Sequence, residues 1–238
     1  MRTSLVSAMI LCAVFCNAQE PARDKKLSNS LKNLYQRGAR TDSVDLILSL
    51  RNGASYQTFN KGRIVHIDRN ANVVLCRMKR DSITSLIPDR EIIFADILRK
   101  PKEELTAGAI DLSLNKLNLA HHLYPDITGE RIKVSLKEQG FDTNDIDLRG
   151  RYFNSGLMAP DQTAHASIMA TMLGGAGNTS PFAKGAAPGV YLTSSDFAKL
   201  LPDADSIYDD YNITVQNHSY GTAIETYYGG DAASYDAS

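Results

Sequence analysis

The stretch from Thr163 to Gly175, TAHASIMATMLGG, limits the possible folds more than any other part of the chain. Small residues surround His165 and would let a helix pack closely against a neighbour. Apolar residues recur four positions apart, as at Ile168 and Met172, which is the spacing of one helical face. The paired glycines that follow are typical of a helix end. The pattern predicts a buried helix with His165 in its first turn.

His165 is also a candidate catalytic residue. A neutral imidazole held at the start of a buried helix can accept a proton as a general base. Taken alone, this stretch leaves a simpler interpretation open, in which His165 only caps the helix.

The first twenty residues predict export. Arg2 gives a positive start, an apolar run covers residues 5–15, and small residues surround Ala18. This pattern is typical of a secretory signal peptide, here residues 1–18. The run is too short to cross a membrane, which takes roughly 20 apolar residues. We therefore expect a protein that is secreted or held in the cell envelope, with no membrane span after the signal is removed.

Composition limits which partners, disulfides and metal sites the chain can have. The net charge of −1 gives no reason to expect nucleic acid as a partner. Cys12 and Cys16 lie in the signal, which leaves Cys76 without an intramolecular disulfide partner in the mature chain. No Cys/His cluster has the spacing of a metal site. The adjacent His121 and His122 point to different faces of a helix and are expected at the surface.

Residues 41–104 predict a small α+β unit. Strands are expected at residues 44–50, 63–67, 73–78 and 92–98, with a short helix at residues 81–86. A linker at residues 105–109 would follow. The position of the unit between a signal peptide and a larger domain favours a removable prodomain. Alone, the unit is equally compatible with a binding module.

Residues 110–238 predict a parallel sheet with helices on its faces. Strands are expected at residues 132–136, 189–193 and 213–217, and helices at residues 163–175 and 203–211. Alternating strands and helices indicate the α/β class. The first strand has one polar face, made by lysine and serine side chains. In such sheets, sites lie at the carboxyl ends of strands, where Glu138 and Ser219 are expected.

Four blocks of this second unit resemble, in order, the subtilisin-like serine proteases. IKVSLKEQGFDTNDIDL at residues 132–148 is similar to the first catalytic block, with Glu138 at the position of the catalytic aspartate. HASIMA, which starts at His165, is similar to the second block and matches the catalytic histidine. GAAP at residues 185–188 is similar to the family's Gly-Val-Ala-Pro. VQNHSYG at residues 215–221 is similar to Val-Ile-Asn-Met-Ser-Leu-Gly, the substrate-binding strand.

The resemblance implies a parallel-sheet subtilisin-like domain, incomplete here, preceded by a small α+β ferredoxin-like prodomain. His165 would be the general base and Glu138 the acid that orients it. Ser219, Tyr220 and Gly221 would pair with a polypeptide substrate as an added strand. The chain's own prodomain would be a second partner. The resemblance implies no organic cofactor, and although calcium is common in the family, no acidic loop here can be assigned to it.

The acid of this site departs from the family pattern. Glu138 is one methylene longer than aspartate and must fold back to reach an imidazole. Asp142 is a fallback acid, although the matching family position lies outside the triad. A further alternative is that Glu138 only pairs with Lys133 or Lys137. We favour Glu138 because it lies at the strand end opposite the histidine helix.

The missing nucleophile is a larger departure from the family pattern. The family's Gly-Thr-Ser motif and its oxyanion-hole asparagine do not occur in this sequence. Ser194, Ser195 and Ser219 match no nucleophile position. We therefore expect the N-terminal part of a longer protease, which would be inactive as this fragment.

Three hypotheses follow from the sequence. The first is a secreted subtilisin-like serine endopeptidase, made as a precursor. The second is a non-catalytic relative, a peptide-binding or inhibitory module that keeps the fold without the catalytic machinery. The third is an unrelated exported α/β binding protein whose blocks match by chance.

Overall fold

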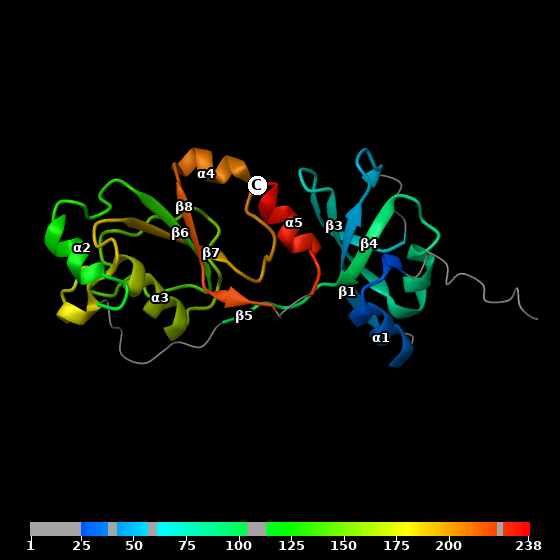
Figure 1. The fold of residues 1–238 in the computed structure, drawn as a ribbon, viewed down its shortest axis with the longest axis horizontal. Coiled ribbons are helices and arrows are strands. Elements are labelled where there is room, and N and C mark those ends of the chain that lie inside the picture. The colour runs from blue at the N-terminus through cyan, green and yellow to red at the C-terminus, as the bar shows by residue number, and fades with distance from the viewer. Residues whose placement is uncertain (1–24, 38–41, 57–60, 104–112, 223–225) are drawn as a thin grey trace, which may run out of the picture. The chain divides into compact units, whose positions relative to one another are not determined.

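The structure is a computed structural model that describes residues 25–37, 42–56, 61–103, 113–222 and 226–238. The expected signal peptide and the linker at residues 105–109 lie outside these ranges. The chain forms two compact units (Figure 1). Unit 1 comprises Met1–Leu98 with Tyr227–Ala237, and unit 2 comprises Arg99–Thr226 with Ser238.

Unit 1 is built on a four-stranded antiparallel sheet in the order β2-β3-β1-β4. Its strands are β1 (Ser43–Leu50), β2 (Arg63–Asp68), β3 (Val73–Lys79) and β4 (Ile92–Ile97). The predicted strands are therefore confirmed to within a residue at each end. The helix α1 (Asn29–Arg37) precedes the sheet, and a 3-10 helix, η3 (Arg80–Leu86), replaces the predicted short helix.

The strand β1 is buried on both faces. Leu46 and Leu48 lie on one face, in a core shared with Ile83 of η3. Ile47 lies on the other face, under the helix α5 (Gly230–Asp236). A Cβ on Gly230 would lie 2.9 Å from two side-chain carbons of Ile47. Glycine is therefore needed for this close approach, and α5 belongs to unit 1 although its sequence falls in the range assigned above to the second domain.

Unit 2 contains a parallel sheet in the order β7-β6-β8. Its strands are β6 (Lys133–Glu138), β7 (Tyr191–Asp196) and β8 (Val215–His218). The helices α3 (Ala164–Gly174) and α4 (Asp205–Tyr211) connect them and lie on opposite sides of the sheet in Figure 1. The predicted parallel α/β arrangement is confirmed. The smaller elements are α2 (Leu117–Leu123), η4 (Pro181–Ala183), β5 (Lys102–Glu103) and β9 (Tyr220–Gly221).

The helix α3 packs on the sheet through its smallest residues. Ala166 and Ala170 are fully buried in one core with Leu136 and Phe141. A Cβ on Gly174 would lie 3.0 Å from Val190, so the end of the helix is also close-packed. The face that carries Ile168 and Met172 is the outer one, with each residue nearly two-fifths exposed. Small side chains, rather than large apolar ones, therefore set the distance between α3 and the sheet.

The polar face predicted for β6 is present, but it is buried rather than solvated. Lys137 is fully buried, and its Nζ donates to the Leu201 carbonyl at 2.9 Å and to Asp203 Oδ1 at 3.0 Å. The other oxygen of Asp203 accepts three hydrogen bonds, from Ser195 at 2.6 Å, Gln216 at 3.1 Å and Tyr208 at 3.3 Å. Burial lowers the pKa of Lys137, and Asp203 opposes this fall.

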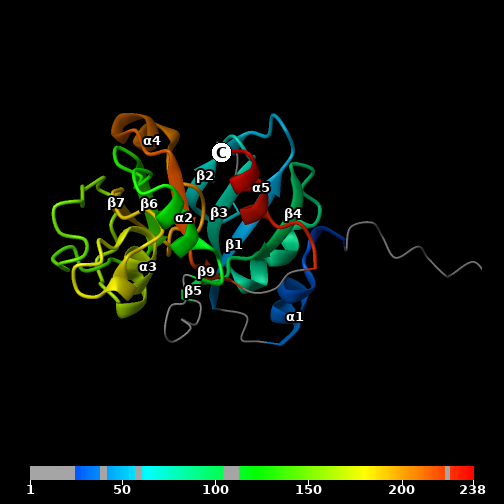
Figure 2. The same cartoon turned by 60° about the vertical axis from the view of Figure 1, so that its left-hand side comes forward.

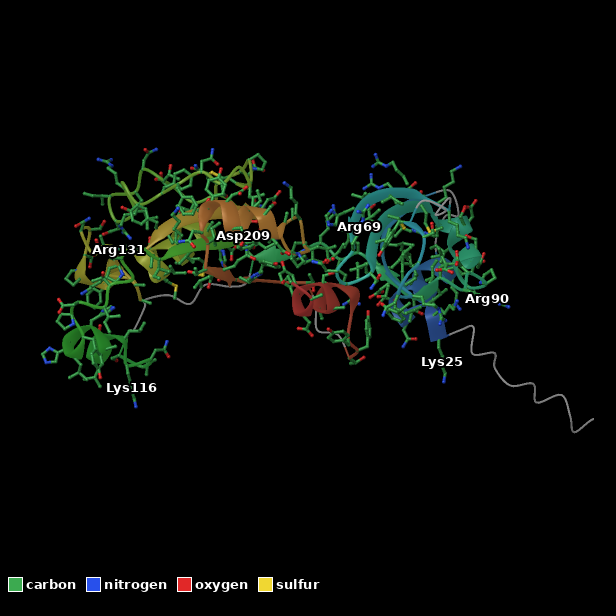
Figure 3. All side chains as sticks on the ribbon, turned by 90° about the horizontal axis from the view of Figure 1, so that it is seen from above. Lys25, Arg69, Arg90, Lys116, Arg131 and Asp209 are labelled. Atoms are coloured by element: carbon green, nitrogen blue, oxygen red, sulfur yellow. The ribbon has the colours of Figure 1, made fainter. Side chains whose placement is uncertain are left out.

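Charged side chains such as Lys116, Arg131 and Asp209 project from the surface of unit 2 (Figure 3). Within the described ranges, no helix has both the length and the apolar character that a membrane crossing would require.

Asp147 holds the loop that follows α3. Its carboxylate accepts hydrogen bonds from the main-chain amides of Asn178 and Thr179, and it is 2% exposed. Burial acts to raise the pKa of this carboxyl, but these donors outweigh burial and hold it below its ordinary 3.8.

Replacing Asp147 with asparagine is expected to cost about 1–3 kcal/mol of unfolding free energy, because it removes the charge from the buried acceptor shared by the Asn178 and Thr179 amides. The folded pKa is lower than the unfolded one, so the stabilisation is complete above the unfolded value and is lost as pH falls through the folded value. Urea unfolding of both proteins between pH 7 and 3 will measure this. A difference that stays constant over that range would contradict the assignment.

Candidate active site

Glu138 and His165 come from different elements and face each other inside unit 2. Glu138 is the last residue of β6, and His165 is the second residue of α3. His165 Nδ1 lies 3.5 Å from Glu138 Oε2, and the side chains are 9% and 0% exposed. The structure therefore brings the two predicted residues together at the carboxyl end of the central strand.

Local hydrogen bonds bring the start of α3 to the end of β6. The Gly140 amide donates to the Asp161 carbonyl at 2.8 Å, and the Thr163 amide donates to the Gly140 carbonyl at 3.0 Å. A Cβ on Gly140 would lie 3.1 Å from the Asp161 carbonyl oxygen, so glycine permits this close approach. Thr163 then caps the helix by accepting a hydrogen bond from the Ala166 amide at 3.1 Å.

Glu138 and His165 carry buried polar atoms that lack hydrogen-bond partners among the described residues. In the described part of the chain, neither oxygen of Glu138 nor Nδ1 of His165 has a hydrogen bond of ordinary geometry. Burial raises the pKa of Glu138, and the negative charge of Glu103 raises it further. The imidazole of His165 and the nearby amide and hydroxyl of Ser219 oppose that rise. Buried polar groups left without partners are more typical of functional sites than of structural cores.

The raised pKa of Glu138 predicts a pH-dependent stability. The folded state keeps its proton to a higher pH than the unfolded state, whose value is near 4.5. Between these two values, stability falls as pH rises, and the fall is complete above the folded value. We expect Glu138→Gln to remove this fall in unit 2. Hydrogen exchange of the β6 amides at several pH values will measure it, and identical pH profiles for the two proteins would contradict the prediction.

The alternatives for Glu138 are not supported. Lys133 Nζ donates to the Tyr211 carbonyl at 2.8 Å, and Lys137 pairs with Asp203. The fallback acid, Asp142, accepts a hydrogen bond from the Asn144 amide at 2.9 Å. Neither lysine nor Asp142 therefore takes the place of the pair that Glu138 forms with His165.

The predicted substrate strand already has a strand partner. Ser219 lies between β8 and β9, and Tyr220 and Gly221 form β9. The strand β5 pairs with β9 in antiparallel register, with Lys102 opposite Gly221 and Glu103 opposite Tyr220. Figure 2 shows β5 and β9 side by side. A segment of the same chain thus occupies the position at which an added peptide strand was expected.

The serines near the sheet are not placed as nucleophiles. Ser194 and Ser195 are fully buried in β7. Ser194 Oγ donates to the Gln139 carbonyl at 3.3 Å, and Ser195 Oγ donates to Asp203. These contacts hold both hydroxyls within the fold.

Two residues near the pair were not singled out from the sequence. Thr163 Oγ1 donates to Glu103 Oε1 at 2.6 Å. Threonine before a helix is a recognisable N-cap, so the position of Thr163 could have been anticipated. Glu103 lies in a polar run and gives no comparable signal.

The described residues contain no group of three His, Cys, Asp or Glu side chains that could hold a metal ion. Asp147, a buried carboxylate beside a loop, directs its oxygens to main-chain amides. His121 Nε2 contacts the Ala186 carbonyl at 3.1 Å. We therefore assign no calcium site among the described residues and derive no chemistry from one.

The fold of the chain is similar to that of subtilisin-like serine proteases. One such structure is fervidolysin from Fervidobacterium pennivorans, a keratinolytic enzyme related to subtilisin, with 16% identity and a TM-score of 0.53 over 84% of this chain. Another is the epidermin leader peptide processing serine protease EpiP from Staphylococcus aureus, with 14% identity and a TM-score of 0.54 over 83% of this chain. The matches span 39% and 56% of those chains. No protein-family model and no curated sequence matches the chain.

Proposed function

We propose that this chain is part of a secreted subtilisin-like serine endopeptidase in which His165 is the general base and Glu138 orients it. The observation that carries the proposal is the buried pair, with Nδ1 and Oε2 3.5 Å apart, at the carboxyl end of a parallel sheet. The fold similarity to serine proteases supports the same reaction class. The nucleophilic serine would come from sequence beyond these 238 residues.

In the proposed mechanism, His165 accepts the proton of the attacking serine through Nε2. Glu138 holds the opposite ring nitrogen, Nδ1, as the protonated one, so that Nε2 is free to act. The buried carboxylate also stabilises the imidazolium that forms. At 3.5 Å, the contact is longer than a hydrogen bond and must shorten when the complete site binds substrate.

The antiparallel pairing of β5 with β9 supports a peptide substrate. An extended peptide can add to β9 through main-chain hydrogen bonds, which form whatever the amino-acid sequence of the peptide. We further propose that residues 41–104 are the prodomain, that β5 pairs with β9 before maturation, and that export uses the predicted signal peptide.

A second candidate is a non-catalytic peptide-binding module. Glu138 in place of aspartate and the long Nδ1–Oε2 distance favour it, because a retained groove needs neither an orienting acid nor a nucleophile. The same strand pairing at β9 would then serve binding alone.

A fluorophosphonate probe separates the two candidates. The full-length protein, after maturation, should be labelled covalently at a serine beyond residue 238 and should hydrolyse casein. Heat-denatured protein and the His165→Ala variant serve as controls and should remain unlabelled. Full-length protein that binds peptide but is neither labelled nor active would overturn the endopeptidase and support the binding module.

A further inference from the structure

In unit 2, strand β9 pairs with an extended segment, β5, whose Glu103 side chain makes a specific contact. In the β5–β9 pair, Glu103 lies opposite Tyr220. Its carboxylate accepts a hydrogen bond from Thr163 Oγ1 at 2.6 Å. The main chain of the segment is thus held by β9, and its acidic side chain reaches the residue that caps the histidine helix.

The Thr163 hydroxyl is oriented to donate. Its oxygen accepts the Ala166 amide at 3.1 Å, so one lone pair is used within the helix cap. The O–H is then free to point toward a carboxylate, as it does toward Glu103. A side-chain amide in place of that carboxylate would present a weaker, uncharged acceptor.

Such a donor matters because Glu138, a second carboxyl group, acts against a negative charge at this position. The charge of Glu103 acts on Glu138 and raises the pKa of that carboxyl. An acidic side chain placed here therefore lies near a second carboxyl group, that of Glu138. The Thr163 hydroxyl supplies an attractive contact specific to an acceptor at this one position of the bound strand.

We propose that Thr163 is a specificity-determining residue of an acidic subsite, which selects peptides with a glutamate at the position opposite Tyr220. Glu103 fills this subsite within the chain. The proposal rests on the proposed function in one respect, which is that the peptides selected are substrates. The subsite itself is a statement about binding and can be tested without hydrolysis.

The test uses the whole 238-residue chain carrying Lys102→Pro and Glu103→Gln, which weakens the pairing of β5 with β9 by removing an amide donor and the carboxylate. The probes are fluorescent acetyl-Arg-Lys-Pro-Lys-Glu-amide, the same peptide ending in Gln, and the isomer in which the last two residues are exchanged. The isomer has the same charge, with its carboxylate moved to the position opposite Gly221. Binding is measured by anisotropy at physiological salt.

We expect the first peptide to bind about fivefold more tightly than either control, as for one charge-assisted hydrogen bond at a partly exposed site. In the same background, Thr163→Ser should keep this preference. Thr163→Asp keeps the helix cap but repels a carboxylate, so it should reverse the preference in favour of the Gln peptide. Circular dichroism of each variant establishes that it is folded.

Equal binding of the three peptides, or an unchanged preference in the Thr163→Asp variant, would overturn the subsite and leave the peptide groove intact. Failure of all three peptides to bind would contradict the groove as well as the subsite. Loss of hydrolysis in the full-length protein, with the binding preference retained, would contradict only the proposed enzymatic activity.

Discussion

Replacing His165 with alanine in the full-length protein is expected to lower kcat for peptide hydrolysis on the order of 10⁶-fold, as for a serine-protease triad that loses its base. No other histidine is placed to substitute, since among the described residues His165 is the one that faces Glu138. Alanine also removes a side chain that is mostly buried, so the folded fraction of the variant must be measured before rates are compared.

Glu138→Gln provides the matched test of the acid. Glutamine keeps the size of the side chain but loses the charge, and kcat should fall on the order of 10⁴-fold. Asp142→Asn is the control, because Asp142 is an exposed carboxylate whose contact is with the Asn144 amide. That variant should stay within a few fold of the parent protein. Equal losses at Glu138 and Asp142, or a His165→Ala variant with near-normal activity, would contradict the assignment of roles.

Replacing Asp203 with alanine is expected to lower the unfolding free energy of unit 2 by about 3–5 kcal/mol, because a buried lysine is left without its counter-ion. Lys137 and Asp203 are 0% and 4% exposed at their side chains, so water cannot readily replace the lost partner. Burial acts to raise the pKa of Asp203, but Lys137, Ser195 and Gln216 outweigh it and hold the pKa low. The carboxylate is therefore charged in the folded state at neutral pH.

The double variant Lys137→Met with Asp203→Ala tests whether the unpaired charge causes the loss. Removing both charges should recover about 2 kcal/mol relative to Asp203→Ala alone. Hydrogen exchange of the β6 amides measures unit 2 without interference from unit 1. A double variant no more stable than Asp203→Ala would mean that the hydrogen bonds from Ser195, Tyr208 and Gln216, and not the ion pair, carry the stability.

The strands could be predicted from the sequence because their signals are local. The apolar runs of β1 and β3, the turn between β2 and β3, and the strand–helix alternation of unit 2 all lie within short windows. The proximity of Glu138 and His165 was also predictable, since the carboxyl end of a parallel strand and the following helix meet at one edge of the sheet.

The burial of Lys137 could not be predicted from a local sequence pattern. Alternation at β6 indicates two faces, but it does not say what covers the polar one. Asp203 lies 66 positions further along the chain, in a segment without periodicity. An ion pair of this kind depends on tertiary packing, which a local pattern does not contain.

The contacts of β5, β9 and α5 were missed for a related reason. Two-residue strands are too short to show alternation, so the pairing of Glu103 with Tyr220 has no sequence signature. The helix α5 is short, and the close contact between Gly230 and Ile47 joins residues far apart in the chain. Such contacts follow from the completed fold.

The position of one proton tests the central claim most directly. If Glu138 orients His165, the imidazole of the 238-residue chain carries its hydrogen on Nδ1, the nitrogen that faces Oε2. Nitrogen-15 NMR of the histidine side chains, with Glu138→Gln as the comparison, measures this tautomer. We predict an Nδ1–H proton that is protected from exchange in the parent chain and loses that protection in the variant. An Nε2–H tautomer that is the same in both proteins would contradict the account.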